Sequence, residues 1–228
     1  MKVGIIQSCY APWRGYFDFM RECDAFVLHD DIQYTKGDWR NRNKIKTPQG
    51  AKWMTVPVHY NHMAQLICET KIDHSTLWPI AHENMLEDNY RAAPYWRDAK
   101  LILGQSYCGQ ETISQLNWMM LGVICGYLGI TTPMLDSRSF NLDPALRKTE
   151  RILAICKALG ATTYLSGPAA KVYLDEDLLR RNGIVPEYKT YDYPEYPQLH
   201  GRFDGNLSVL DLIANVGPDA PLYIWRKS

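Results

Sequence analysis

The sequence predicts an α/β fold in which a mostly parallel sheet is flanked by helices. Short apolar runs of strand length alternate along the chain with segments of helical spacing. Residues 146–167 contain a helix that feeds into an apolar strand and then a small-residue loop, which is half of a β–α–β unit. Strands that alternate with helices in this way favour a Rossmann-like layout.

The chain opens with two short strands joined by a helix. Residues 3–7 and 25–29 are β-type apolar runs, and residues 15–22 between them have helical spacing. After a Pro-Gln-Gly turn, residues 52–58 form a third predicted strand. Pro57 cannot donate to a ladder, so it places that strand at a sheet edge or ends it.

The middle of the chain is predicted to be helical. Residues 75–90 and 112–127 have helical spacing, with Ser75 and Thr112 as N-caps. We interpret residues 75–130 as a helical insertion or subdomain within a single α/β domain of residues 1–228.

The last third of the chain returns to alternating strands and helices. Met134-Leu135 forms a strand, and Gly160 stops the helix that precedes the strand at residues 162–165. The remaining predicted elements are a helix over 175–182, a strand over 184–191 and a helix over 208–216 that Ser208 caps and Gly217 closes.

Composition limits the function classes. The chain has 228 residues, is 46% hydrophobic, and balances 25 basic against 25 acidic residues, so no net charge favours nucleic acid. The most apolar window, residues 116–130, is too short to cross a bilayer. The N-terminus lacks a signal-peptide pattern, and the six cysteines form no C-x-x-C pair. These features predict a cytoplasmic protein with free thiols and no membrane span.

A dense series of polar and aromatic residues follows the first two strands. It comprises Gln7, Pro12, Trp13, Gly15, Tyr16, Phe17, Asp24, Phe26, Val27, Asp30, Asp31, Gln33, Tyr34, Lys36, Trp39, Asn41, Arg42 and Asn43. This series resembles the motif of the WbqC-like protein family, and the similarity continues through 92–95, 148–165 and 207–212. Ser8 stands where the family usually has Pro, and residues 164–170 differ from the Gly-rich turn of many members.

The resemblance implies a biological setting. Members of the family often occur among genes for O-antigen and other surface polysaccharides, and some among genes for small natural products. It therefore implies a role in assembling such compounds, while the reaction itself has to be argued from the residues.

The first candidate site consists of polar residues after the first two strands. Arg and Lys suit phosphate or carboxylate, amides can recognise sugar hydroxyls, and an Asp at a strand end can act as a general base. Its predicted substrate-binding members are Gln7, Tyr16, Asp31, Gln33, Lys36, Asn41 and Arg42, with Asp30 and His29 as candidate proton acceptors. The alternative is an ion-pair network that orders a long loop.

Two further candidates lie elsewhere. Ser137, with Arg138, Lys148 and Arg151, would bind an anion, because a cation near a helix start gains nothing from the dipole. A solvated helix start is the alternative. Ser166, Gly167 and Tyr173 belong to a small-residue loop where Gly167 would let a ligand approach the backbone, although a simple turn is nearly as good an interpretation.

Cys9 would be an acyl-accepting nucleophile if it reaches the site, but packing as a small hydrophobic residue is the better interpretation. The histidines around His59-x-x-His62 match no strong metal signature, so no metal ligand is assigned. The chain also lacks the Gly-rich motifs of P-loop NTPases and NAD enzymes and the nucleophile elbow of serine hydrolases.

The leading hypothesis is a transferase that moves an acyl or aminoacyl group to an amine of a sugar nucleotide or small molecule. The donor would be a thioester, for instance phosphopantetheine on an acyl-carrier protein, or another activated acid, including a nucleotide donor. One alternative is a non-catalytic protein that binds a nucleotide sugar or a partner enzyme. Another is a degenerate nucleotidylyltransferase-like enzyme, since Trp13-Arg14-Gly15-Tyr16 stands where those enzymes carry His-x-Gly-His.

Overall fold

The computed structural model describes residues 1–225, and these form two compact units. The first unit consists of residues 1–7, 18–31 and 131–192. The second consists of residues 8–17, 32–130 and the chain from residue 193 onward. Each unit is described by itself below, and the prediction that residues 1–228 form a single domain stays a prediction.

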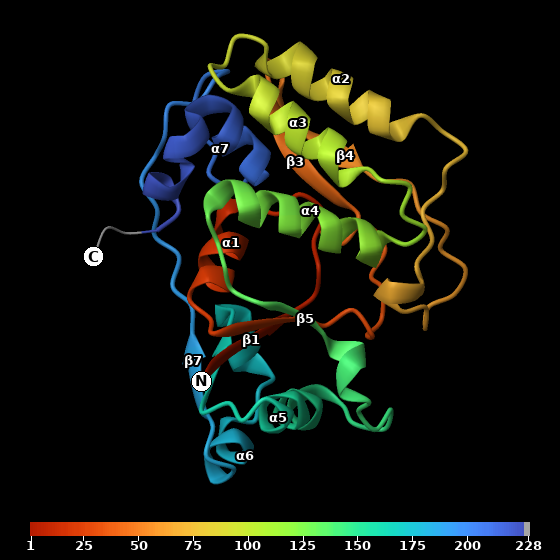
Figure 1. The fold of residues 1–228 in the computed structure, drawn as a ribbon, viewed down its shortest axis with the longest axis vertical. Coiled ribbons are helices and arrows are strands. Elements are labelled where there is room, and N and C mark those ends of the chain that lie inside the picture. Colours follow the sequence, from red (N-terminus) through yellow and green to blue (C-terminus); the bar gives the residue numbers. More distant parts are fainter. Residues whose placement is uncertain (226–228) are drawn as a thin grey trace. The chain divides into compact units, whose positions relative to one another are not determined.

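The first unit contains a five-stranded parallel sheet in the order β5-β2-β1-β6-β7 (Figure 1). Its strands are β1 (Lys2–Ile6), β2 (Ala25–Leu28), β5 (Met134–Asp136), β6 (Thr163–Ser166) and β7 (Val185–Tyr188). Every neighbouring pair in this sheet is parallel. The chain builds outward from β1 through β2 to β5 and then crosses to β6 on the other side of β1. The predicted α/β fold with a parallel sheet is confirmed, and its strand order reverses between β1 and β6.

Helices cover both faces of this sheet. On one face, α5 (Lys148–Ala158) and α6 (Glu176–Arg181) contribute Ile155 and Leu179 to a core that also contains alternate residues of β1 and β2. On the other face, Phe19 from the last turns of α1 (Arg14–Arg21) packs edge-on against Phe26. A Cβ at Gly4 would lie 2.5 Å from the Phe19 ring, so only glycine lets this helix approach β1 so closely.

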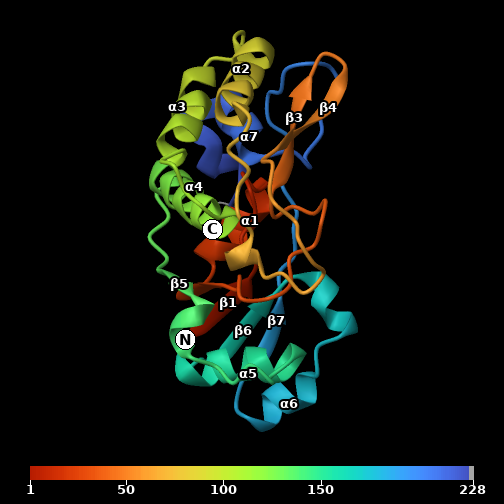
Figure 2. The ribbon, with the colours of Figure 1, turned by 90° about the vertical axis from the view of Figure 1, so that its right-hand side faces the viewer.

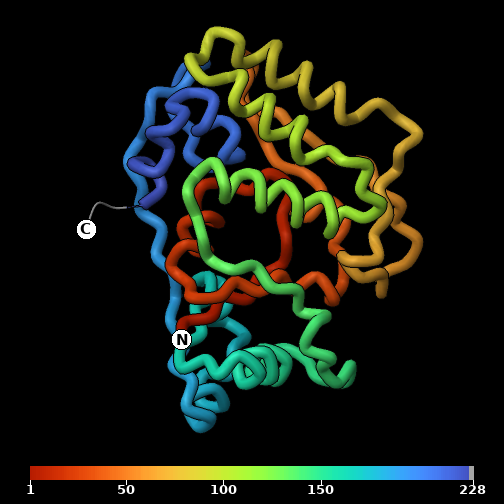
Figure 3. Tube along the Cα trace, viewed as in Figure 1, coloured from red at the N-terminus to blue at the C-terminus, as the bar shows by residue number. Residues whose placement is uncertain are grey.

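The second unit combines a β-hairpin with four longer helices. The hairpin pairs β3 (Arg42–Thr47) with β4 (Gly50–Thr55) in antiparallel register (Figure 2). The helices are α2 (Trp78–Tyr90), α3 (Trp96–Ser106), α4 (Ile113–Leu128) and α7 (Val209–Val216). Figure 3 follows the chain as it leaves the sheet after β2, passes through the hairpin and α2 to α4, and returns to the sheet at β5. The predicted helical insertion in the middle of the chain is therefore present.

Several predicted boundaries are confirmed by their caps. Thr112 accepts a hydrogen bond from the backbone of Gln115 in a reciprocal capping box, and Ser208 caps α7, which Gly217 closes. Other predictions were wrong. Leu77, not Ser75, is the N-cap of α2, because Ser75 instead donates its backbone N–H to Asp73.

Two elements were missed from the sequence. Strand β3 was read as a polar loop because charged and polar residues occupy most of its positions, and the partner strand β4 ends at Thr55, short of the predicted residue 58. Helix α3 was also missed, because it begins without a side-chain cap at Tyr95. No helix in residues 1–225 combines the length and the apolar character needed to span a bilayer.

Candidate functional site

The carboxyl ends of β1, β2 and β5 lie level with one another in the first unit. Ile6 pairs with Leu28, and Leu28 pairs with Asp136. The residues that come next, Gln7, His29 and Ser137, are therefore delivered to the same edge of the sheet. Ligands of open parallel sheets bind outside this edge, close to where the strand order reverses.

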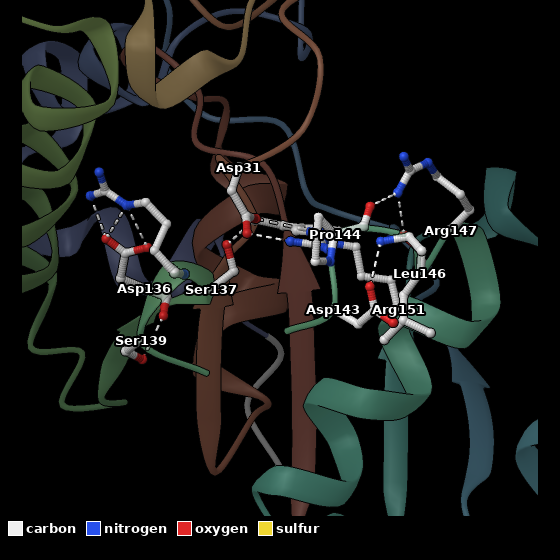
Figure 4. Close-up of polar contacts among 12 residues, drawn as sticks. Asp31, Asp136, Ser137, Ser139, Asp143, Pro144, Leu146, Arg147 and Arg151 are labelled. Atoms are coloured by element: carbon white, nitrogen blue, oxygen red, sulfur yellow. Dashed lines mark hydrogen bonds and ion pairs between the residues drawn. The ribbon is translucent and has the colours of Figure 1, made fainter. Parts of the chain in front are cut away.

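A cluster of four polar side chains occupies this edge: His29, Asp31, Ser137 and Arg151. Ser137 donates its hydroxyl proton to Asp31 Oδ1 at 2.5 Å, and the Arg151 guanidinium forms an ion pair with Asp31 Oδ2. Figure 4 shows Ser137 and Arg151 both directed at the Asp31 carboxylate. The Asp31 and Arg151 side chains are only 16% and 11% exposed, and Ser137 is fully buried. We call this group the edge cluster.

His29 is held in one protonation state by its neighbours. Arg151 Nε donates to His29 Nε2 at 3.0 Å, so this nitrogen accepts and the proton of the neutral ring lies on Nδ1. Burial lowers the pKa of His29 below its ordinary value, with the carboxylate of Asp31 opposing the shift and the Arg151 guanidinium adding to it. His29 is therefore a neutral imidazole at pH 7 whose basic nitrogen is directed at Arg151.

The other predicted residues of this unit lie around the same edge or on the helices beside it. Asp30, at the end of β2, is buried with 2% exposure, and the role of proton acceptor assigned to it stays a prediction. Ser166 is buried and donates to the Tyr164 hydroxyl at 3.2 Å. A Cβ at Gly167 would meet nothing within 4 Å, so the backbone there borders open space, while Tyr173 is 58% exposed.

Lys148 differs from the others in its backbone. It is the first residue of α5, its side chain is exposed, and its φ of +47° lies in the left-handed region that a side chain disfavours. The preceding Arg147 contributes no side-chain cap to the helix and instead donates to the Pro144 and Leu146 carbonyls (Figure 4). Among residues 1–225, Lys148 forms no hydrogen bond or ion pair with the edge cluster, and its predicted role in anion binding stays a prediction.

The remaining predicted residues belong to the second unit. Cys9 and Tyr16 are buried, and Asn41 is buried with its amide nitrogen donating to the Val56 carbonyl at 2.8 Å. Burial of Cys9 agrees with the interpretation that it packs as a small hydrophobic residue. The others, Gln33, Lys36 and Arg42, are exposed or half-buried. Their predicted roles in substrate binding stay predictions.

Comparison with known proteins identifies the family of the chain. Residues 7–223 match the WbqC-like protein family. The chain belongs to the WbqC-like protein family. An uncharacterized protein of Mycobacterium tuberculosis, Rv1507c, is 45% identical to it over 227 residues, which cover 98% of this chain and 97% of that protein. No solved structure matches the chain.

Part of the WbqC-like motif has a structural explanation within the second unit. Asn43 donates its amide nitrogen to the Ala11 carbonyl at 2.8 Å and to the Tyr10 carbonyl at 3.3 Å. Ala11 has a φ of +41° and precedes Pro12, a combination that costs backbone energy. Asn43 thus holds the strained turn that follows β1. Ser8, which replaces the family's usual Pro, accepts a hydrogen bond from Asn117 at 2.9 Å.

A second buried network surrounds Asp211, in the stretch 207–212 that resembles the family, and was missed from the sequence. The Asp211 carboxylate is fully buried and accepts hydrogen bonds at 2.6 Å from Tyr90, Tyr196 and Gln198. Burial raises the pKa of Asp211 above its ordinary value, although the hydrogen bonds from these three donors act to lower it. The sequence signal was a lone Asp on the apolar face of a helix, which needs a partner when it is buried.

Arg14 is another buried charge of this unit. Its guanidinium donates to the Pro194 and Tyr223 carbonyls at 2.8 and 3.0 Å and lies 4.8 Å from the centre of the Tyr193 ring. Burial lowers the pKa of Arg14. Arg14 begins α1, in the segment compared above with the His-x-Gly-His of nucleotidylyltransferases. One terminal nitrogen donates to the two carbonyls, while the buried Nε meets no acceptor within residues 1–225. Among residues 1–225, no group of three metal-ligating side chains is placed to hold an ion.

Proposed function

We propose that this protein is a transferase of surface-polysaccharide or natural-product assembly that moves an acyl or aminoacyl group onto an amine. The donor is a thioester or another activated acid, and the acceptor is an amino group on a sugar nucleotide or a small molecule. The gene setting of WbqC-like proteins supports the biological role, and a cytoplasmic location is part of the proposal. The edge cluster is the single observation that carries the chemistry.

The free energy required to bury the charges of the edge cluster supports a functional role for it. Desolvating the Asp31 and Arg151 charges costs several kcal/mol per ion, and apolar residues of the same volume would stabilise a strand end as well or better. Perturbed titratable groups in such a setting concentrate at functional sites. The cluster also stands where an open parallel sheet binds its ligand.

In the proposed reaction the acceptor nitrogen attacks the carbonyl carbon of the donor. A C–N bond forms, the C–S bond of the thioester breaks, and the thiolate leaves. The amine loses one proton, which His29 or Asp30 accepts. His29 is suited to this role because it is neutral, and a ligand that draws the Arg151 guanidinium away would free its Nε2. Arg151 would then hold the ligand's carbonyl or phosphate oxygen through its planar fork.

The test is turnover with matched variants. Candidate acyl thioesters would be paired with amino-sugar nucleotides, and product would be followed by mass spectrometry. We expect Arg151→Lys to lower kcat/KM by about 100-fold, as loss of an oriented donor does, and Asp30→Asn to lower it as well. Arg180→Lys is the control, because Arg180 forms an exposed ion pair with Glu176 on α6 and belongs to no candidate site. Unchanged turnover in both Arg151→Lys and Asp30→Asn would remove this site from the mechanism.

A non-catalytic binding protein is the second candidate, and one observation favours it. Asp31, Ser137 and Arg151 satisfy one another in the structure, so the cluster needs no reacting partner to be stable. A binder would show saturable affinity for the nucleotide sugar and no product with any donor. The nucleotidylyltransferase alternative has less support, because Arg14 and Tyr16 in the relevant turn are buried.

A further inference from the structure

The segment that contains the β3–β4 hairpin carries an excess of positive charge in a chain whose total charge is zero. Residues 32–56 contain one carboxylate, Asp38, and six cations. The cations are Lys36, Arg40, Arg42, Lys44, Lys46 and Lys52. Such a local excess attracts anions and is screened by salt within about 8 Å.

Two of these cations have partners within the second unit. Arg40 lies 3.7 Å from Asp38 and donates to the Ser8 carbonyl. Lys46 is buried and donates to Gln198 at 2.7 Å. The other four, Lys36, Arg42, Lys44 and Lys52, form no ion pair within residues 1–225.

The strand register gathers two of the four around an aromatic ring. Lys44 pairs directly with Trp53 across the hairpin, and Arg42 lies two residues away on the same face. The Arg42 guanidinium carbon is 4.1 Å from the centre of the Trp53 ring, and Lys44 Nζ is 4.7 Å from it. Trp39 adds a second ring, 5.3 Å from that of Trp53 between centres, and it is 42% exposed. We call Trp39, Arg42, Lys44 and Trp53 the hairpin face.

Arg42 is not satisfied by the protein. One terminal nitrogen donates to the Gly37 carbonyl, while Nε is buried and meets no acceptor in the part of the chain that the structure describes. Stacking on Trp53 explains where the guanidinium lies. Within residues 1–225 it leaves the positive charge without a carboxylate partner and the Nε–H without an acceptor. Nε itself is closed to solvent, but no carboxylate within residues 1–225 pairs with the guanidinium charge. An anion bound beside the terminal nitrogens would therefore gain a charge-assisted contact.

We propose that the hairpin face binds a nucleoside diphosphate group. Arg42 and Lys44 would contact the phosphate oxygens, and the exposed ring of Trp39 would stack on the base. Cations beside exposed aromatic rings are the arrangement with which proteins bind the charged backbone and the flat bases of nucleic-acid components. The inference rests on the proposed function where the acceptor is a sugar nucleotide, and it names the part of the second unit that would bind the diphosphate. It requires no turnover at the edge cluster.

Isothermal titration calorimetry with ADP, GDP, CDP and UDP tests the proposal, with the free nucleosides and pyrophosphate as partial ligands. We expect at least one nucleoside diphosphate to bind more tightly than pyrophosphate or its own nucleoside. Lys44→Gln should weaken that binding by about tenfold, because it removes one charged contact. Trp39→Leu should weaken nucleotide binding by about tenfold and leave pyrophosphate binding unchanged.

Lys52→Gln is the matched control. It removes the same charge from the same hairpin, but Lys52 pairs with Ile45 and belongs to the opposite face by register. Equal weakening by Lys44→Gln and Lys52→Gln would overturn the proposal, because it would show unspecific attraction to charge. Absence of binding by all four nucleotides would also overturn it, and so would binding of a single-stranded oligonucleotide alone. The titrations contain no acyl donor and need no turnover. Loss of nucleotide binding with normal turnover, or the reverse, therefore distinguishes failure of this proposal from failure of the transferase hypothesis.

Discussion

Removing one partner of the Asp31–Arg151 ion pair should destabilise the protein more than any exposed charge change. The two side chains are 16% and 11% exposed, so a charge left alone there would be poorly solvated. Breaking a buried pair in this way costs about 3–5 kcal/mol. We expect about 3 kcal/mol for Arg151→Met, the lower end of that range, because both side chains keep some contact with water.

The double variant Asp31→Asn/Arg151→Met should recover part of this loss, because neither charge is then left alone. The measurement is urea denaturation at pH 7, followed by tryptophan fluorescence, for the two single variants and the double variant. An interaction free energy of about 1–3 kcal/mol between the sites is expected. Arg138→Met is the control, since its pair with Asp136 is 52% exposed on the arginine side and should contribute less than about 1 kcal/mol. Equal losses for Arg151→Met and Arg138→Met, or strict additivity in the cycle, would refute the reasoning.

Two further predictions concern other positions. Burial lowers the pKa of His82 from 6.5 to about 4, so the unfolded chain binds its proton first, and stability present at neutral pH is lost as the pH falls from about 6.5 to about 4. The loss should reach about 3 kcal/mol in wild type relative to His82→Gln, measured by urea denaturation across that range, and parallel curves would contradict it. Lys148→Gly should raise the free energy of unfolding by up to about 1 kcal/mol by relieving the left-handed backbone. Glu150→Gly in the same helical turn should instead lower it by about 1 kcal/mol, and a loss in both variants would refute the strain argument.

The sequence predicts the sheet well because its three central strands, β2, β1 and β6, are mostly buried and carry their own apolar signal. Apolar runs such as Ala25–Leu28 have few alternatives to a buried strand, and strands joined through helices favour parallel pairing. Hairpin strand β3 carries no such signal. Only Ile45 is apolar among its six residues, and its buried positions include Asn43, whose burial depends on the carbonyls of a distant turn.

The sequence indicates that certain polar side chains lie together, while their roles stay predictions. His29, Asp31 and Ser137 follow strands, and parallel strands bring their carboxyl ends to one edge of the sheet. Arg151 was considered only as part of an anion site at a helix start. Its contact with Asp31 spans 120 residues, and it depends on the crossover that puts α5 on the sheet. Such a pairing cannot be read from local periodicity, because it follows from the order in which the strands assemble.

Variants of the Asp31–Arg151 ion pair can separate effects on stability from effects on chemistry at this edge of the sheet. If Asp31 and Arg151 serve only to fix the strand ends, the double variant that regains stability should regain every property of the protein. If Arg151 binds the donor or acceptor, the same double variant will be well folded and still deficient in turnover or binding. The comparison is informative because the double variant leaves neither charge buried without its partner. Apolar residues of similar volume usually replace a buried pair at no cost in stability. A stable double variant without activity would therefore assign the edge cluster to function, and a stable double variant with full activity would assign it to the strand ends alone.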